Sequence, residues 1–480
     1  MRTEKNSFTF AEKVPMTLIR SISGIRGTIG GKPGEWLTPP DIVRFTAGFA
    51  KWLLRNNRKK IRVVIGRDAR TSGGMISDLV SGTLLGMGID VLDIGLTTTP
   101  TAGIAIPGSD SQGGIMITAS HNPRQWNALK LLNEAGEFLS REEGETVLKI
   151  SEHPDLPFAA TQELGTYSYE DRFLRTHIDK ILALPVVDTE AIRKANFSVV
   201  VDGINSSGGI AVPMLLKALR VNKIEKINCD PDGNFSHPPE PLPENLSELC
   251  QRVLKVGANV GFAVDPDVDR LAIVNETGEP FGEEYTLVAV ADYILGITPG
   301  DTVSNLSSTQ ALEIITRKAG GNYHASAVGE VNVVEKMKET HAVIGGEGNG
   351  GVIYPPLHYG RDALTGIALF LSHLARTKMT CSRLRDRYPP FYISKNRIEL
   401  DPGIDIDDLL EKIRLRYKSH PISTVDGIRI RFNGEWVHIR KSNTEQIIRI
   451  YAESNNQEKA DNLARKITRD FREILNNTET

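Results

Sequence analysis

One pattern recurs along the chain and constrains the fold most. In it, a short apolar run is followed by a polar loop and then by a helical segment. Residues 61–66, 197–203 and 260–264 are strand-like runs of this kind. Strand, polar loop, helix and strand in that order are typical of α/β units with a largely parallel sheet. Ligands of such sheets bind where strands end in loops. The pattern therefore predicts several α/β units whose loops carry the function.

The same periodicity places the individual elements. Strands are expected near 61–66, 90–94, 114–118, 197–203, 260–264, 271–274, 302–306, 393–399, 427–432, 436–440 and 446–452. Helices are expected over about 38–55, 74–87, 169–183, 210–220, 245–257, 284–295, 309–318, 331–338, 406–418 and 457–475.

The chain length allows three or four domains, because 480 residues are available and a domain takes about 150. We predict three mixed-sheet α/β domains over 16–165, 166–278 and 279–388. The Pro389-Pro390 pair suggests a boundary, and the strand and helix pattern after it predicts a smaller α+β domain over 389–480. Residues 1–15 are polar and lack the apolar core of a signal peptide, so we interpret them as a disordered extension.

Composition excludes several classes of function. The net charge of −3 gives no reason to expect nucleic acid or an anionic membrane as a partner. The three cysteines are far apart, which argues against a disulfide framework or a zinc site and fits a reducing compartment. No apolar run approaches the ~20 residues of a membrane span. We therefore expect a cytoplasmic protein with neither nucleic acid nor a membrane as a partner.

Ser120 is the first candidate functional residue. It follows the apolar run 115–117 and the small residues Thr118 and Ala119, on a turn that Pro123 enforces. A serine hydroxyl at a strand end, close to basic groups, is where a nucleophile that handles phosphate could lie. The alternative is an ordinary turn in which Ser120 caps neighbouring backbone groups.

Asp265, Asp267 and Asp269 form the second candidate, directly after the strand 260–264. Side chains two positions apart on an extended chain point the same way, so these three carboxylates are expected to converge. Carboxylates so close together repel each other unless a cation lies between them. All-oxygen ligands suit Mg²⁺, which often shares the oxygens of a substrate phosphate.

Two further interpretations of this hexapeptide exist. An EF-hand would place its last ligand at Glu276, but Arg270 occupies the sixth position, where glycine is required. A phosphatase with an aspartyl nucleophile also carries Asp-x-Asp after an apolar strand, and Asp265 would then be the nucleophile. The phosphatase interpretation stays open on the residues alone.

Two glycine-rich stretches could bring backbone close to a ligand. Gly24 to Gly31 surround Arg26, which suits an anion, although a tight turn with an exposed arginine is more common. In 345–351, Glu347 and Asn349 could bind sugar hydroxyls, with a flexible loop as the alternative. The residues that follow, His358, Arg361 and Asp362, are interpreted as turn and cap residues.

A last polar turn lies in the C-terminal part. Arg440, Ser442, Asn443 and Thr444 offer a guanidinium, an amide and two hydroxyls, the groups that phosphate oxygens require. An ordinary polar hairpin turn is the alternative.

Together these loops resemble the α-D-phosphohexomutase family, over the chain from residue 16 to the C-terminus. The four loops that match, in the family's order, are 118–123 (phosphoserine loop), 265–270 (metal loop), 346–350 (sugar loop) and 440–444 (phosphate loop). Residues 23–28 and 120–132 are most similar to bacterial phosphoglucosamine mutases. The resemblance implies three α/β domains and a smaller C-terminal domain around a central cleft.

The resemblance also implies a reaction. A phosphoryl group would move between O6 and O1 of an aldohexose phosphate, with glucosamine 6-phosphate and glucosamine 1-phosphate as the expected pair. Ser120 would carry the phosphoryl group, and a hexose 1,6-bisphosphate would be both intermediate and activator. One Mg²⁺ would be held by Ser120, as phosphoserine, and by Asp265, Asp267 and Asp269. A monomer or homodimer is expected.

The remaining roles also follow from the family. Lys130, ten residues after Ser120, is the expected general base, with a pKa lowered by burial among cations. Arg26 and Arg270 would stabilise the transferring phosphoryl group, and His121 would position it. The sugar would be bound by Glu347 and Asn349, and the phosphate that does not move by Arg440, Ser442, Asn443 and Thr444.

The sequence departs from the family's pattern at three places. Gly348-Asn349 replaces Met-Ser or Gln-Ser, Gln446 stands where a proline is usual, and Ala327-Val328-Gly329 lacks the lysine of some relatives. These departures leave the hexose open, with phosphoglucomutase or phosphomannomutase activity as the alternative. An aspartyl-nucleophile phosphatase and a non-catalytic sugar-phosphate binding protein also stay open.

Overall fold

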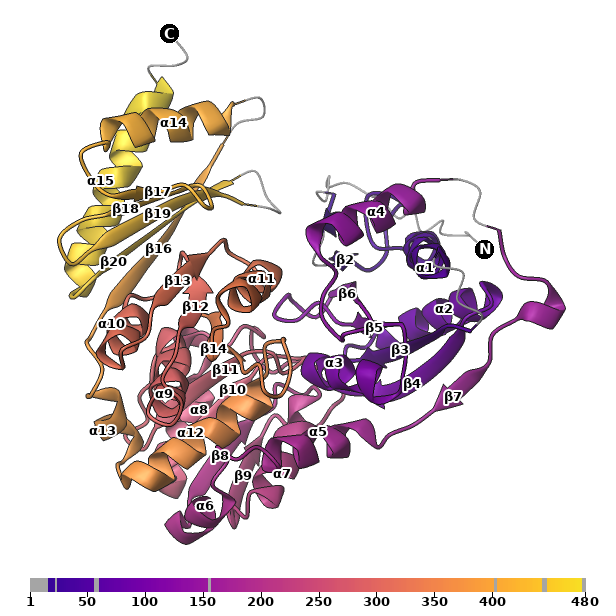
Figure 1. Cartoon of the computed structure of the whole chain (residues 1–480), viewed down its shortest axis with the longest axis horizontal. Coiled ribbons are helices and arrows are strands. Elements are labelled where there is room, and N and C mark those ends of the chain that lie inside the picture. Colours follow the sequence, from indigo (N-terminus) through magenta and orange to yellow (C-terminus); the bar gives the residue numbers. More distant parts are fainter. Residues whose placement is uncertain are drawn as a thin grey trace, which may run out of the picture.

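Four β-sheets, each with its own helices, organise the computed structural model (Figure 1). The structure describes residues 16–21, 24–55, 60–153, 157–400, 404–442 and 447–476. We call the four sheets with their helices the first to fourth units. In Figure 1 the fourth unit (yellow) lies above the middle two, and the first unit (indigo) lies to their right. The prediction of three mixed-sheet α/β units and a smaller α+β unit is confirmed.

The first unit has a seven-stranded sheet in the order β1-β2-β6-β5-β3-β4-β7. Its strands are β1 (Ile19–Ser21), β2 (Gly24–Thr28), β3 (Arg62–Arg67), β4 (Asp90–Leu96), β5 (Gly113–Ile117), β6 (Trp126–Leu132) and β7 (Tyr167–Tyr169). Its helices are α1 (Pro39–Leu54), α2 (Gly73–Gly86), α3 (Thr99–Gly108) and α4 (Arg141–Ser151). The predicted boundary at 165/166 stays a prediction, and β7, just after it, pairs with β4 of this sheet.

The second and third units have four-stranded sheets, in the orders β11-β10-β8-β9 and β13-β12-β14-β15. The second comprises α5 (Phe173–Leu182), α6 (Thr189–Ala195), β8 (Ser198–Asp202), α7 (Gly208–Ala218), β9 (Lys223–Ile227), α8 (Ser247–Val256), β10 (Val260–Val264) and β11 (Leu271–Asn275). The third comprises α9 (Glu283–Leu295), β12 (Thr302–Asn305), α10 (Ala311–Lys318), β13 (Tyr323–Ser326), α11 (Glu330–Thr340), β14 (Ile344–Glu347), β15 (Gly351–Ile353), α12 (Ala363–Thr377) and α13 (Cys381–Arg385).

One topology recurs in the first three units, although no repeat is visible in the residues. A central strand pairs in parallel with the next two strands of the chain, and the fourth returns antiparallel beside the third. In the first unit these are β3, β4, β5 and β6, in the second β8 to β11, and in the third β12 to β15. The turn between the third and fourth strands therefore has the same place in each unit.

This shared turn is where the predicted loops lie. Ser120 lies between β5 and β6, the three aspartates between β10 and β11, and the glycine loop after Glu347 between β14 and β15. Each turn starts at the carboxyl end of a strand that is parallel to the central strand, which is the edge where α/β sheets bind ligands. The topology thus presents one candidate functional loop from each of three units.

The middle two units share one hydrophobic core, whereas the first and fourth units have cores of their own. Helix α12 joins the middle pair, because almost every one of its residues is buried and it packs against α9 of its own unit and α6 of the second. Asp362 caps this helix by accepting hydrogen bonds from the backbone N–H groups of Leu364 (2.9 Å) and Thr365 (3.2 Å).

The fourth unit is an antiparallel sheet in the order β16-β20-β19-β18-β17, covered by two helices. Its elements are β16 (Tyr392–Glu399), α14 (Ile406–Arg416), β17 (Ile422–Ser423), β18 (Ile428–Arg431), β19 (Trp436–Lys441), β20 (Ile447–Ser454) and α15 (Gln457–Asn476). The predicted elements of this part are all present within a few residues.

The sequence prediction omitted five helices, α3, α4, α6, α12 and α13, of which α3 and α12 are apolar on nearly every side. A helix that is buried all round lacks the alternation of apolar and polar residues that marks a surface helix. Among the described residues, no helix is both long and apolar enough to cross a membrane. The predicted extension over 1–15 lies outside the described residues.

Candidate active site

The loop of Ser120 is held in an unusual conformation. Ser120 has a φ of 49°, in the left-handed region that non-glycine residues seldom adopt. Its backbone N–H donates to Thr118 Oγ1 (2.9 Å), and its carbonyl accepts from the guanidinium of Arg70 (2.5 Å). The same guanidinium donates to the carbonyls of Asn122, Pro123 and Trp126 (2.6, 2.7 and 3.0 Å). This geometry fixes where the Ser120 hydroxyl points.

The Ser120 hydroxyl points to the aspartates of the second unit. Its Oγ donates to Asp265 Oδ2 at 2.6 Å, across 145 positions of sequence. The three aspartates are completely buried, and each has an oxygen within 4.8 Å of the others. The serine and the acidic trio therefore meet as the family resemblance implies.

The reason for the convergence differs from the prediction. The aspartates do not lie on an extended strand, because β10 ends at Val264 and the chain then turns, with Val268 at a φ of 64°. The N–H groups of Asp269 and Arg270 both donate to Asp265 Oδ1 (3.1 Å each). A tight turn, rather than strand alternation, gathers the carboxylates.

These carboxylates fit a hard cation. Within the described chain, Asp267 Oδ1 and Asp269 Oδ1 are buried and accept no hydrogen bond. A buried acceptor without a partner is costly, and a cation bound by oxygens removes that cost. The EF-hand interpretation is wrong, because Leu271–Asn275 is strand β11 and Glu276 accepts a hydrogen bond from the Ser382 N–H (3.0 Å).

Lys130 lies on β6, beside the same carboxylates. Its Nζ is 2.6 Å from Asp267 Oδ2 and 3.4 Å from Asp269 Oδ2. The predicted lowering of the Lys130 pKa is wrong for this structure. Burial acts to lower the pKa, but the charges of Asp267 and Asp269 outweigh it and raise the pKa above its ordinary value. The nearest charged neighbours of Lys130 are therefore two anions and not the predicted cations.

A histidine and two arginines lie near Ser120. His121 Nδ1 is 3.4 Å from Ser120 Oγ, and burial together with the charge of Arg270 lowers the pKa of His121 well below its usual range. Burial and the nearby Arg270 also lower the pKa of Arg26. Arg270 is paired with Glu240, whose Oε1 is 2.8 Å from Nη1. Two arginines that repel each other beside a serine form a site that an anion would stabilise.

Glu347 of the predicted sugar loop is buried and accepts three hydrogen bonds. It accepts from Arg361 Nη1 (2.6 Å), Asn305 Nδ2 (2.8 Å) and the Gly329 N–H (3.0 Å). Asn349 is half-buried, and its Oδ1 accepts from the Gly351 N–H (3.2 Å). The loop is thus held by internal bonds rather than flexible.

The interpretation of Arg361 as a turn residue is wrong, whereas that of Asp362 as a cap is confirmed. Arg361 is nearly buried and pairs with Asp269, Glu347 and Glu330. The sequence signal for it is weak, because an arginine at the start of a helix is usually exposed.

The predicted phosphate loop is described only in part, because Asn443 and Thr444 lie outside the described residues. Arg440 on β19 lies opposite Arg449 on β20. Burial lowers the pKa of Arg440, with a further contribution from Arg449. Ser442 is buried at the end of β19, where its N–H donates to the Ile447 carbonyl (2.9 Å). Like charges directly across a sheet destabilise it unless an anion lies between them, so Arg449 joins the candidate anion ligands.

The fourth unit contacts the third where the family lysine is missing. Asp426 Oδ2 accepts from the Val328 N–H (3.0 Å), and Ser307 Oγ is 2.8 Å from His438 Nδ1. Side chains of the fourth unit therefore lie beside the position of Ala327. These contacts place β19, which carries Arg440, against the third unit.

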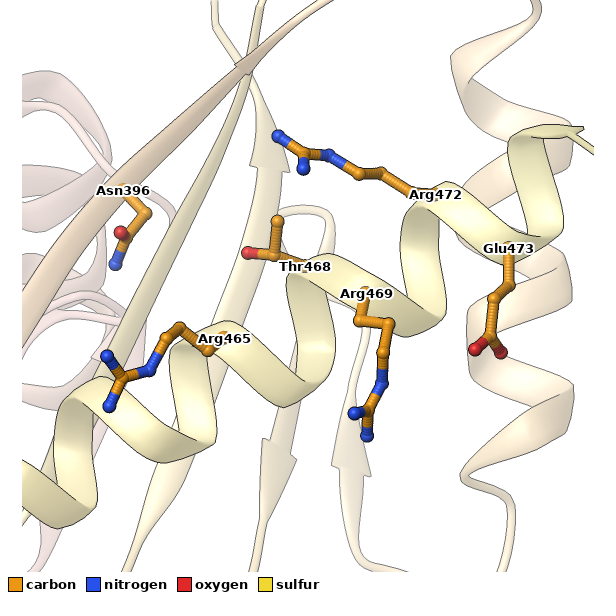
Figure 2. A pocket seen from close by; sticks show the side chains of 6 residues that line it. All are labelled: Asn396, Arg465, Thr468, Arg469, Arg472 and Glu473. Carbon is orange, nitrogen blue, oxygen red and sulfur yellow. The ribbon is translucent and has the colours of Figure 1, made fainter.

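A second group of arginines does not belong to the site. Arg465, Arg469 and Arg472 line a groove between α15 and Asn396 on the fourth unit. Their guanidinium groups point in different directions (Figure 2). They therefore do not converge on a common anion, and we assign no site there.

Comparison with known proteins gives consistent matches over most of the chain. Sequence profiles of four domain families match: Phosphoglucomutase/phosphomannomutase, alpha/beta/alpha domains I (18–157), II (175–278) and III (282–391), and the C-terminal domain (405–469). A phosphoglucomutase/phosphomannomutase of Thermococcus kodakarensis is 35% identical over 90% of this chain and 95% of its own length. A phosphoglucosamine/phosphogalactosamine mutase of Sulfurisphaera tokodaii is 31% identical over 92% and 97%.

Solved structures give the same fold. A phosphoglucomutase/phosphomannomutase family protein from Burkholderia thailandensis superposes with a TM-score of 0.80 at 25% identity, over 96% of this chain and 98% of that one.

Proposed function

The chain belongs to the phosphoglucomutase/phosphomannomutase family of phosphohexomutases, and from this premise we propose that it interconverts glucosamine 6-phosphate and glucosamine 1-phosphate. The observation that carries the mechanism is the 2.6 Å contact between Ser120 Oγ and Asp265 Oδ2. It joins the serine that would carry the phosphoryl group to the carboxylates that would hold the metal. The choice of glucosamine is supported by relatives named phosphoglucosamine mutases.

The proposed reaction has two transfers. Phosphoserine 120 gives its phosphoryl group to the free O1 or O6 of the bound hexose phosphate, whose hydroxyl proton passes to Lys130. The departing Ser120 Oγ takes up a proton, so the product is a hexose 1,6-bisphosphate and an unmodified serine. After the bisphosphate reverses its orientation in the site, its other phosphoryl group passes to Ser120 Oγ, which loses its hydroxyl proton, and a proton returns to the sugar oxygen. The bisphosphate also serves as the activator that phosphorylates Ser120.

The cation has a defined place in this proposal. Asp265, Asp267 and Asp269, with an oxygen of phosphoserine 120, would hold Mg²⁺. When bound, Mg²⁺ supplies positive charge that offsets the charge of the transferring phosphoryl group and competes with Lys130 for two carboxylates. Lys130 can accept a proton only in its neutral form, so release from these carboxylates favours its role as base.

The other residues bind and orient. Arg26 and Arg270 stabilise the charge of the transferring group, and His121 donates a hydrogen bond to it. Glu347 and Asn349 bind sugar hydroxyls. Arg440, Ser442, Asn443 and Thr444, with Arg449 added from the geometry, hold the phosphate that does not move.

The phosphoserine is tested by mass. Active protein should be about 80 Da heavier than the unmodified chain, the mass of one phosphoryl group, and Ser120→Ala should abolish both the added mass and turnover, by about 10³-fold or more. An aspartyl-nucleophile phosphatase would instead release inorganic phosphate, survive Ser120→Ala and lose activity with Asp265→Asn. That pattern would refute the mutase mechanism.

The hexose is tested by comparing kcat/KM for glucosamine, glucose and mannose 6-phosphates, with hexose 1,6-bisphosphate added. We expect the glucosamine compound to be preferred by at least about tenfold, a difference of about 1.4 kcal/mol in transition-state binding. The second candidate is phosphoglucomutase/phosphomannomutase activity, which the name of the Thermococcus kodakarensis relative favours. Equal or better use of glucose or mannose 6-phosphate would select it. Binding without turnover would indicate a non-catalytic binding protein.

A further inference from the structure

Arg361 connects the metal loop, the sugar loop and the first residue of helix α11. Its Nη2 donates to Asp269 Oδ2 (2.7 Å) in the metal loop, and its Nη1 donates to Glu347 Oε2 (2.6 Å) in the sugar loop. Its Nε is 3.1 Å from Glu330 Oε2, and its backbone N–H donates to Glu330 Oε1 (3.0 Å). Glu330 begins α11, just after Gly329, whose N–H donates to Glu347.

The geometry requires an arginine. A planar guanidinium can donate to two carboxylates in fixed directions at once, whereas the ammonium of a lysine is a single point on a flexible stem. Arg361 is 9% exposed and Glu347 4%, while Asp269 is completely buried, so little water is available to replace a lost bond. One buried side chain therefore bridges the two loops.

The sugar loop leaves space for this side chain. A Cβ atom added at Gly351 would lie 2.3 Å from Arg361 Cδ and 3.0 Å from Arg361 Cγ. Gly351 begins β15 and its φ lies outside the left-handed region. Room for the Arg361 stem, rather than backbone conformation, thus explains a glycine at this position.

Arg361 also leaves one oxygen of Asp269 for a cation. It binds Oδ2, while Oδ1 accepts no hydrogen bond within the described residues. A neighbour that bonds one carboxylate oxygen fixes the direction of the other, and this is how outer groups orient metal ligands.

We propose that Arg361 is a positioning residue that couples the metal loop to the sugar loop, so that cation binding and hexose binding strengthen each other. This inference rests on the proposed function, because it takes Asp269 as a metal ligand and Glu347 as a sugar ligand. When Glu347 accepts a hydrogen bond from a sugar hydroxyl, its attraction for the Arg361 guanidinium is weaker, so Arg361 binds Asp269 Oδ2 more strongly. Asp269 Oδ1 is then held in the direction of the cation. By linkage, the bound cation favours the hexose to the same extent.

The test compares wild-type protein with Arg361→Lys. This variant keeps the positive charge but loses the planar guanidinium that donates to two carboxylates at once. Mg²⁺ is titrated calorimetrically into unphosphorylated protein, with and without saturating hexose 6-phosphate, which cannot turn over on an unmodified serine. We expect Arg361→Lys to weaken Mg²⁺ binding by about tenfold or more, the usual effect of losing an outer-shell partner. Gly351→Ala, which crowds Arg361 without changing any charge, should weaken it in the same direction.

Arg376→Met provides the matched control. Arg376 lies near the other end of α12 and is paired with Asp188 (2.9 Å), with its side chain 42% exposed. This variant removes an arginine ion pair without touching the site, so its Mg²⁺ affinity should equal that of wild type. Urea unfolding of each variant checks that the protein is folded.

The coupling itself is the decisive measurement. In wild-type protein, saturating hexose 6-phosphate should lower the Mg²⁺ dissociation constant several-fold. In Arg361→Lys, the Mg²⁺ dissociation constants measured with and without hexose 6-phosphate should be equal. The inference is overturned if Arg361→Lys keeps the wild-type ratio, or if wild type shows no coupling. Failure of the proposed function is recognised separately, because wild-type protein would then bind no Mg²⁺ or would convert no hexose phosphate.

Discussion

At the scale of the residue, single buried arginines hold the loops of the site in place. Arg70 is 1% exposed, is paired with Asp68 (3.1 Å), and donates to four carbonyl groups of the 120–126 turn. Arg361 has the same role between the metal and sugar loops. In both cases one guanidinium satisfies several acceptors that could not reach water, which is a use of arginine that lysine cannot reproduce.

Arg70→Leu is therefore expected to destabilise the protein and to disorder the Ser120 loop. Removing one partner of a buried ion pair leaves the other charge uncompensated and typically costs about 3–5 kcal/mol. Urea unfolding measures the loss, and the rate of Ser120 phosphorylation by hexose 1,6-bisphosphate measures the effect on the loop. Arg175→Leu, which breaks the exposed pair with Asp179, should change neither. A normal phosphorylation rate in Arg70→Leu would contradict this account.

At the scale of the element, the site depends on turns between the third and fourth strands of a recurring topology. The sugar-loop turn packs on the metal-loop strand, because the Leu271 N–H donates to the Gly350 carbonyl (3.2 Å). Gly350 has a φ of +82°, and a Cβ there would lie 2.2 Å from the Leu271 carbonyl oxygen. Backbone thus meets backbone where two units join.

Gly350→Ala should therefore lower both the stability and the kcat/KM of the enzyme. The left-handed conformation alone costs about 1–2 kcal/mol for a residue with a Cβ, and the close contact with Leu271 adds to this. Gly434→Ala is the matched control, since Gly434 also has a positive φ (+76°) but open space around it. It should show the conformational cost alone, with unchanged kcat/KM. Equal behaviour of the two variants would argue against the packing explanation.

The meeting of Ser120 with the three aspartates could be predicted from sequence because each group belongs to a compact local motif. Asp265, Asp267 and Asp269 are recognisable within a few residues of each other, whereas Arg70 stands 50 positions before Ser120 and Arg361 stands 92 positions after Asp269. Nothing local distinguishes these arginines from exposed ones. The sequence predicts the shift of the Lys130 pKa with the wrong sign for the same reason, because the shift depends on which charges the fold brings nearest.

At the scale of the whole molecule, the middle two units form one body through their shared core. The first unit attaches to it by apolar contacts around Phe173 of α5 as well as by polar contacts, and the fourth unit makes hydrogen bonds and ion pairs with the third. The first unit attaches through Ser120 and through the Thr99 N–H, which donates to the Asp267 carbonyl (2.9 Å). A buried chain of hydrogen bonds also links Thr101 of the first unit, His177 of the second and Asp362 of the third (2.9 Å each). The first and fourth units are thus joined to the middle two outside the shared core.

The attachment of the fourth unit should depend on pH. His438 lies between Ser307 Oγ (2.8 Å) and the Asp426 carbonyl (2.6 Å), and burial lowers its pKa from 6.5 to about 4. Because its pKa is lower in the folded protein than in the unfolded chain, His438 takes up a proton more readily once its buried surroundings open. Its contribution to the free energy of unfolding is therefore present above pH 6.5 and is lost as the pH falls toward 4, up to about 3 kcal/mol in total.

Acidification from pH 7 to pH 5 is accordingly expected to loosen β19 and, with it, Arg440. Trp436 on the same strand is buried and reports this in a variant whose other tryptophans are replaced by phenylalanine. The urea concentration at the midpoint of the transition that Trp436 reports should fall as the pH is lowered, in protein that is otherwise folded. It should fall less in His438→Gln, whose side chain cannot take up a proton. His420→Gln, in the same unit, should keep the full dependence. If His438→Gln kept it too, other groups would control the attachment, and the affinity for hexose phosphate would not follow the protonation of His438.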